Sequence, residues 1–108
     1  MDWHVEITGN AEEDIEEIYQ YIAISLEEPD IAWNQTKRIR DKIGKLSYMP
    51  ERYSVIQDEP WKSREVRRIN IDNYAAFYLV DSKSAKVTVI RVLYARRDLS
   101  SELASYFG

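Results

Sequence analysis

In the first part of the chain, the spacing of apolar residues is that of one strand followed by two helices. Residues 3–8 alternate loosely between apolar and polar side chains, which predicts a short, half-buried strand. Apolar residues then recur at steps of three and four as far as Leu26, which predicts an amphipathic helix with Asn10 as its N-cap. A second stripe of the same period lies between Pro29, which is tolerated near a helix start, and Pro50, which ends the helix. The short link predicts an antiparallel α-hairpin, with inner stripes formed by Ala11, Ile15, Ile18, Ile22 and Leu26 on the first helix and by Ala32, Thr36, Ile39, Ile43 and Leu46 on the second.

The second part of the chain has the shorter period of β-strands. Residues 65–71 alternate between two sides, residues 74–80 are nearly all apolar, and residues 87–94 are apolar and rich in β-branched side chains. An apolar run without polar alternation is typical of a central strand that is covered on both faces. Asp72 and Asn73 belong to residue types that tolerate positive φ, so they predict a tight hairpin turn between the first two strands.

Two further segments complete the predicted fold. Residues 53–57 predict a short edge strand, because Pro60 limits what can follow it. Residues 99–107 predict either a short helix or an irregular end. Successive strands with short turns pair antiparallel, which predicts a meander of three or four strands with the helices covering one face. The sequence therefore predicts an α+β fold, formed by a single domain over residues 1–108.

Composition excludes several kinds of site. The chain has no cysteine, and so it has neither a disulfide nor a thiolate ligand for a metal. It also lacks the P-loop, GxSxG and HExxH motifs, and we expect neither a metal nor a cofactor. The N-terminal residues do not have the pattern of a secretory signal, and no apolar run reaches the roughly 18 residues that a membrane helix needs. These observations predict a cytoplasmic protein without membrane contact.

The net charge of −4 hides a division of charge along the chain. Residues 1–36 contain ten acidic residues and no Lys or Arg, so this part carries −10. Residues 37–108 contain all fifteen basic residues against nine acidic ones, a balance of +6. This division predicts two faces of opposite charge. The alternative is simply two solvated helix faces of opposite sign.

The single histidine and the acidic helix do not predict catalysis. His4 lies in the first predicted strand, where a lone histidine is more often a structural or surface residue than a catalytic one. The acids of the first helix have spacings that follow its solvent face, which favours solvation or a surface that faces a partner. These acids are Glu12, Glu13, Glu16 and Glu17.

What remains is a set of arginines on and around the predicted strands. Guanidinium groups bind phosphate or carboxylate with two hydrogen bonds and keep their charge at any relevant pH. In a meander, the arginines near residue 67 and those near residue 96 can share a face. Alternatively, most of them pair with local acids such as Glu65 and Asp98, and nearby tyrosines fill the core instead of stacking on bases. The arginines are Arg64, Arg67, Arg68, Arg91, Arg96 and Arg97, and the tyrosines are Tyr74, Tyr78 and Tyr94.

Three segments carry a family resemblance when they are taken in order. Residues 11–22, AEEDIEEIYQYI, are similar to an opening helix of the pattern A..DL.EI..YI. Residues 49–53, MPERY, match a second helix that closes on FPE(R). Residues 67–98 contain the sequence RRI, then NYAAFYLV, then VIRVLYARRD. Together, over nearly the whole chain, these segments resemble the RelE/ParE superfamily of toxins from type II toxin–antitoxin systems.

The resemblance implies particular partners. Toxins of this superfamily bind a cognate antitoxin, which usually supplies the DNA-binding domain, so that operator DNA is contacted only through the antitoxin. RelE-like members cut mRNA on the ribosome, whereas ParE-like members block DNA gyrase. The gyrase and the ribosome with its mRNA are therefore the two expected targets.

The nuclease pattern of RelE-like members is only partly present. Arg68 and Arg96 stand at two of its basic positions, but Ala75 stands where an Arg is expected and Glu102 falls near the position of a tail tyrosine. Tyr106 is an imperfect substitute for that tyrosine. The closing Arg-Arg-Asp looks more like the ParE-like ending.

Three hypotheses follow. The first is a ParE-like toxin that inhibits growth by binding a protein, with gyrase as the target and no chemistry of its own. The second is a ribosome-dependent endoribonuclease of the mRNA interferase type, and the third is a non-toxic binding module that kept the antitoxin interface. The catalytic candidates of the second are Arg68, Arg96, Tyr78 and Tyr106, and the candidates for contact with the target or RNA are Arg64, Arg67, Arg68, Arg96 and Arg97.

Overall fold

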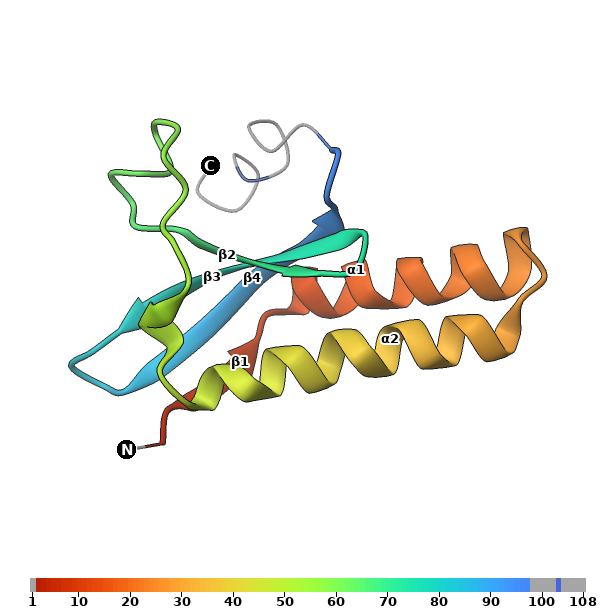
Figure 1. Cartoon of the computed structure of the whole chain (residues 1–108), viewed down its shortest axis with the longest axis horizontal. Coiled ribbons are helices and arrows are strands. Elements are labelled where there is room, and N and C mark those ends of the chain that lie inside the picture. The colour runs from red at the N-terminus through yellow and green to blue at the C-terminus, as the bar shows by residue number, and fades with distance from the viewer. Residues whose placement is uncertain (1, 98–102, 104–108) are drawn as a thin grey trace.

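Two helices cover one face of a four-stranded sheet in the computed structural model, which describes residues 2–97 and Leu103 (Figure 1). This arrangement confirms the predicted α+β class. Within the described part of the chain, no helix is long and apolar enough to cross a lipid bilayer. The elements in chain order are β1 (His4–Ile7), α1 (Gly9–Gln20), the π-helical turn η1 (Tyr21–Ser25), α2 (Pro29–Gly44), the 3-10 turns η2 (Lys45–Ser47) and η3 (Pro50–Arg52), β2 (Arg67–Ile71), β3 (Tyr74–Asp81) and β4 (Lys86–Tyr94).

The sheet is mixed: the predicted antiparallel meander is present with three strands, and the first strand joins it in a pairing that the sequence did not predict. Strands β2, β3 and β4 do form an antiparallel meander, but β1 pairs parallel to β4 at the edge, giving the order β1-β4-β3-β2. The register runs from His4 opposite Lys86 to Ile7 opposite Val89. Rules for neighbouring strands could not predict this pair, because the whole α-hairpin and two strands separate its members in sequence.

The predicted turn between β2 and β3 is present, whereas the predicted edge strand is not. Ile71 pairs with Tyr74, and Asp72 between them has a φ of 56°, in the left-handed region that its residue type tolerates. Residues 53–57 form only an isolated bridge from Val55 to Arg67. The Arg67 guanidinium donates to the main-chain carbonyls of Glu51 and Tyr53, so these two carbonyls do not extend a ladder.

The first helix begins with a different cap from the one predicted. Thr8, rather than Asn10, is the N-cap, and its Oγ1 accepts a hydrogen bond of 3.2 Å from the Ala11 amide. The same hydroxyl donates to the carbonyl of Ile90, also at 3.2 Å. The cap therefore attaches the start of α1 to strand β4.

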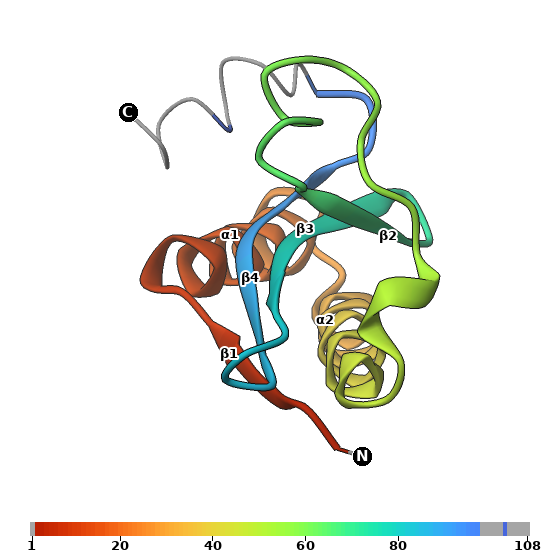
Figure 2. The ribbon, with the colours of Figure 1, turned by 90° about the vertical axis from the view of Figure 1, so that its left-hand side faces the viewer.

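The core lies on both faces of the sheet. Figure 2 shows the green loop before β2 at the top of the view, on the opposite side of the strands from α2. The predicted helix stripes pack on one face, except that Leu26 is exposed at the tip of the hairpin and Ile18 is only partly buried. On the other face, residues from the segment before β2 and Leu103 pack against the sheet. Apart from Leu103, the short helix predicted over residues 99–107 lies outside the described residues. As predicted, β3 is covered on both sides. The second cluster consists of Ile56, Trp61, Val66, Ala75, Phe77, Ile90, Leu93 and Leu103.

A buried ion pair connects α1 to β4. The Asp14 carboxylate accepts hydrogen bonds from Arg91 Nε at 2.7 Å and Nη2 at 2.8 Å, and from the Val92 amide at 2.9 Å. Because β1 pairs with β4 only as far as Val89, the N-cap Thr8 and Asp14 of α1 bond the main chain of β4 beyond that point, at Ile90 and Val92.

We predict that Asp14→Asn destabilises the fold by about 3 kcal/mol or more, because it removes the negative charge that faces the Arg91 guanidinium in a site where both side chains are mostly buried. The free energy of unfolding from urea titration at pH 7 measures the effect. Glu12→Gln is the control, since its bidentate pair with Arg40 is about half exposed and should contribute less than about 1 kcal/mol. An equal loss of unfolding free energy in the two variants would contradict the larger structural role that we give to the pair of Asp14 and Arg91.

Candidate functional site

The predicted arginines do not form one cluster, because two of them serve the fold. Arg67 is partly buried and donates to the carbonyl of Glu51 at 3.0 Å and to that of Tyr53. Arg91 is committed to Asp14 on the helix side of the sheet. The alternative expected local acids as partners for most of the arginines, whereas the partners here are two main-chain carbonyls for Arg67 and the distant Asp14 for Arg91.

Arg68 lies beside the turn that follows β4. Its Nε donates to Asn70 Oδ1 at 2.9 Å, its guanidinium lies 5.6 Å from the Phe77 ring centroid, and its Nη2 is 3.5 Å from the carbonyl of Ala95. The structure therefore brings β2 and the segment with Arg96 and Arg97 together at one edge. Arg64, Arg96 and Arg97 are exposed to solvent.

The tyrosine candidates have different positions. Tyr78 is fully buried, and its hydroxyl donates to the Pro50 carbonyl at 2.6 Å. Burial raises the pKa of Tyr78 to about 12, although Arg67 and Arg52 act in the opposite direction. A phenol held in this way neither exchanges a proton near neutral pH nor reaches a substrate. Tyr106 lies outside the described residues.

His4 lies on the surface of β1. Its side chain is 71% exposed, and its Nε2 is 3.4 Å from the Glu6 carboxylate. Among the described residues, no three His, Asp or Glu side chains are arranged to hold a metal ion.

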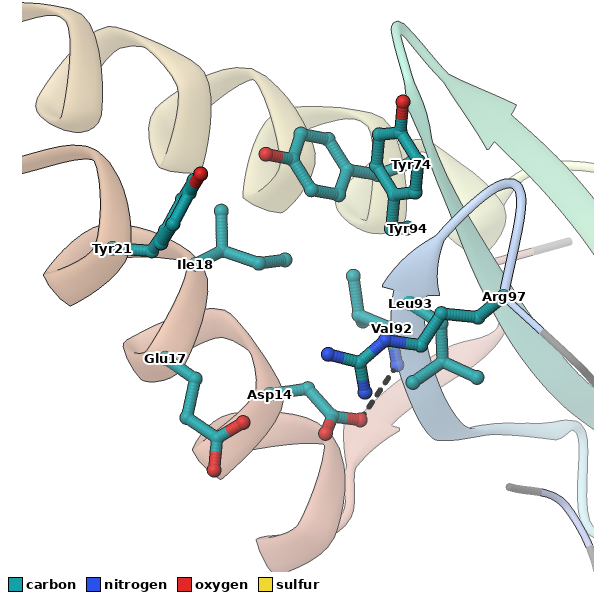
Figure 3. Close-up of a pocket in the computed structure, with 9 residues that line it drawn as sticks. All are labelled: Asp14, Glu17, Ile18, Tyr21, Tyr74, Val92, Leu93, Tyr94 and Arg97. Atoms are coloured by element: carbon teal, nitrogen blue, oxygen red, sulfur yellow. Dashed lines mark hydrogen bonds between the residues drawn. The ribbon is translucent and has the colours of Figure 1, made fainter. Parts of the chain in front are cut away.

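A groove lies between α1 and the end of the β3–β4 pair, and we call it the α1 groove (Figure 3). It has a volume of about 540 Å³. Three tyrosines, one from η1 and one from each strand, stand around it, and charged side chains lie at its rim. Its lining consists of Asp14, Glu17, Ile18, Tyr21, Tyr74, Val92, Leu93, Tyr94 and Arg97.

The tyrosines give the α1 groove an aromatic wall. The rings of Tyr74 and Tyr94 meet edge to face, with centroids 6.0 Å apart and planes at 78°. Burial raises the pKa of Tyr74, and Tyr94 and Tyr21 raise it further. Tyr21 and Tyr94 remain 57% and 43% exposed, so they are available to a partner.

The α1 groove was missed by the sequence analysis. The available signal was local: Ile18 and Tyr21 lie one helical turn apart at the border of the buried stripe. That spacing says which helix face they share, but it does not show that Tyr94 at the end of the last strand faces the same space. With an apolar floor, aromatic walls and charges of both signs at its rim, the groove is suited to binding rather than to acid–base chemistry.

Comparison with known proteins gives a family and a fold. Residues 5–99 match the family model described as the ParE toxin of the type II toxin–antitoxin system parDE. No curated protein matches the sequence. A chain of the chromosomal ParDE system from P. aeruginosa has 18% identity and a TM-score of 0.71, with 87% of this chain and 97% of that chain covered.

Two RelE-type structures are also similar. A chain of a RelBE toxin–antitoxin complex from Mycobacterium tuberculosis has 19% identity and a TM-score of 0.62, covering 87% of this chain and 92% of that one. A mutant E. coli RelE toxin in the free state has 16% identity and a TM-score of 0.64, with 97% of this chain and 93% of that chain covered. At these identities the structural likeness shows the fold alone.

We predict that Tyr78→Phe lowers the free energy of unfolding by about 1–2 kcal/mol at pH 7, because the buried Pro50 carbonyl loses its donor. The folded pKa of about 12 lies above the ordinary value of 10.0, so the stability that Tyr78 contributes is present below pH 10 and is lost as the pH rises towards 12. The wild type should therefore exceed Tyr78→Phe in free energy of unfolding by less at pH 11 than at pH 7. Tyr48→Phe, on a side chain that is 58% exposed, is the control and should show neither effect.

Proposed function

Because the chain belongs to the family of ParE toxins of type II toxin–antitoxin systems, we propose that it inhibits growth in the cytoplasm by binding DNA gyrase and carries out no reaction itself. The observation that carries this proposal is that the tyrosine candidate for nuclease chemistry is committed to the fold. Tyr78, the only catalytic tyrosine candidate among the described residues, donates its hydroxyl to Pro50 in the core.

The requirements of RNA cleavage support the same proposal. A ribonuclease of this kind needs groups that assist proton transfer from the ribose 2′-hydroxyl and stabilise the negative transition state. Ala75, where the resemblance expects a basic residue, is fully buried, and Arg67 is held by main-chain carbonyls. Binding to a protein target requires none of these groups.

We assign contact with the target to the arginines at the edge where β2 meets the turn after β4. Arg68 is fixed there by Asn70, and exposed guanidinium groups follow β4. Arginine is among the residues that most often dominate the energy of protein interfaces. The proposed contact residues are Arg64, Arg68, Arg96 and Arg97.

A cognate antitoxin is the second proposed partner. The matched family is defined by toxin–antitoxin systems, and the similar structures include chains from such complexes. In this proposal the toxin meets operator DNA only through the antitoxin.

Expression of the chain without its antitoxin tests the proposed activity. We expect arrested growth, loss of negative supercoiling in a resident plasmid, and mRNA without new 5′ ends within codons. New ends at in-frame codons would show that the chain is an endoribonuclease, and normal growth would leave only a non-toxic binding module.

The endoribonuclease remains the second candidate, because the structure places Arg68 next to the segment that carries Arg96. Combining Arg68→Ala with Arg96→Ala distinguishes the two functions. We expect about tenfold weaker inhibition of supercoiling by the purified variant, with ribosome-bound mRNA intact for both wild type and variant.

Lys45→Ala combined with Lys83→Ala is the matched control for this test. Both lysines are exposed, they lie away from the proposed contact edge, and the change in net charge is the same. The control should inhibit like the wild type. If the arginine variant keeps full inhibition, these residues do not contact the target.

A further inference from the structure

The side chain that holds Arg68 in place is neutral. Its Nε donates to the amide oxygen of Asn70 at 2.9 Å, and Arg68 forms no ion pair with any residue that the structure describes. Four other arginines do face carboxylates, those of Glu12, Asp14, Glu51 and Asp72. A neutral acceptor orients a guanidinium group and leaves its positive charge uncompensated, so Arg68 keeps that charge for a partner.

We propose that Arg68 is an oriented receptor for a carboxylate of the protein target, and that Asn70 is the residue that positions it. The inference rests on the proposed function and adds the chemical group that this contact binds. It also assigns a role to Asn70, a residue that sets the strength of the contact by acting through Arg68.

The pleat of β2 places Arg68 and Asn70 side by side. They are two residues apart on one strand, so both side chains lie on the face of the sheet that the helices do not cover. Arg68 pairs across the strands with Phe77, and its guanidinium lies 5.6 Å from the centroid of that ring. Asn70 pairs with Ala75, whose methyl group does not extend over this face as a longer side chain would. The Arg68 side chain therefore has room to reach Asn70.

The contacts of the Arg68 guanidinium leave one side of it open. Asn70 occupies Nε, the Phe77 ring lies within cation–π distance, and the Ala95 carbonyl is 3.5 Å from Nη2, which is long for a hydrogen bond. Nη1 donates to no group within residues 2–97 or Leu103. Nη1 and Nη2 together present the parallel N–H groups that match the two oxygens of a carboxylate.

Orientation by Asn70 lowers the cost of binding. An unrestrained arginine side chain loses rotamer freedom when a partner fixes it, and this loss offsets part of the gain from the new hydrogen bonds. For Arg68, part of that loss has already occurred on folding. Arg96 is exposed on the segment next to Arg68 and adds positive charge that attracts an acidic group.

The most informative variant is Asn70→Asp. The aspartate keeps an acceptor for Nε, but its charge pairs with Arg68 and competes with a carboxylate of the target. If Asn70 served only the fold, Asn70→Asp would therefore inhibit gyrase like the wild type. Asn70→Ala removes the acceptor, and Arg68→Lys keeps the charge without the paired N–H groups. Asn34→Ala is the matched control, because Asn34 is exposed on α2, which covers the other face of the sheet.

Each full-length variant is titrated into a gyrase supercoiling assay. We expect Asn70→Ala to weaken inhibition by about three- to tenfold, the range for one side chain that must be ordered on binding. Asn70→Asp should weaken it at least as much, although its thermal unfolding should match that of the wild type, and Asn34→Ala should not weaken it. Adding Asn70→Ala to Arg68→Lys should cause no further loss, because Asn70 acts through Arg68. Additive losses in this double variant would contradict the inference.

The NMR signal of the Arg68 Nε–H group tests the orientation without the target. We expect this signal to be protected from exchange with water in the wild type and in Asn70→Asp, and to be lost in Asn70→Ala. Equal protection in Asn70→Ala would show that Asn70 does not position Arg68.

The two measurements separate this inference from the proposed function. If the wild type leaves supercoiling unchanged, the proposed function fails and the proposed ligand fails with it. If the wild type inhibits supercoiling and Asn70→Asp inhibits equally well, the proposed function stands and the receptor inference fails. Binding of the wild type to DNA alone that Asn70→Asp abolishes would assign the contact to phosphate and overturn the carboxylate.

Discussion

The three hydrogen bonds to the carboxylate of Asp14 connect the two parts of this protein. They come from the Arg91 guanidinium and the Val92 amide, and they cross 77 and 78 residues of sequence. Removing both charges from water is costly, and the geometry offsets that cost because both carboxylate oxygens are satisfied. The pair holds α1 against β4 where β1 no longer does, so the position of the helix, and with it the shape of the α1 groove, depends on this contact.

Some of the acidic residues of the first part of the chain form ion pairs with arginines of the second part inside the fold. Besides Asp14 and Arg91, Glu12 on α1 forms a bidentate pair with Arg40 on α2. Other acids of α1 remain exposed, and so do arginines after β4. The two surfaces therefore have different characters: the α1 groove is apolar with acids along α1, whereas the edge assigned to the target is basic. They meet at Arg97, which is exposed and also lines the groove.

Several residues whose side chains could take part in catalysis instead stabilise the fold. The arginine of β2 at position 67 bonds two carbonyls of the segment before it, and the Tyr78 hydroxyl fixes the turn at Pro50 to the sheet. Residue type alone does not distinguish these roles, because the groups that stabilise a phosphate or move a proton are the same groups that satisfy a buried carbonyl. Only the partner of each side chain decides between them.

By itself the sequence determined the two helices and four strands, the α+β class, the helix stripes, the burial of β3 on both faces and the turn at Asp72. These features follow from periods of two or three to four residues and from local backbone preferences, which act between neighbours in the chain. Tertiary structure alone decided the parallel pairing of β1 with β4, the loss of the edge strand at residues 53–57, the roles of Arg67 and Arg91, and the existence of the α1 groove. Each of these depends on contacts between residues far apart in sequence, and hydrophobic spacing specifies which side of an element faces inward but not which distant element it meets.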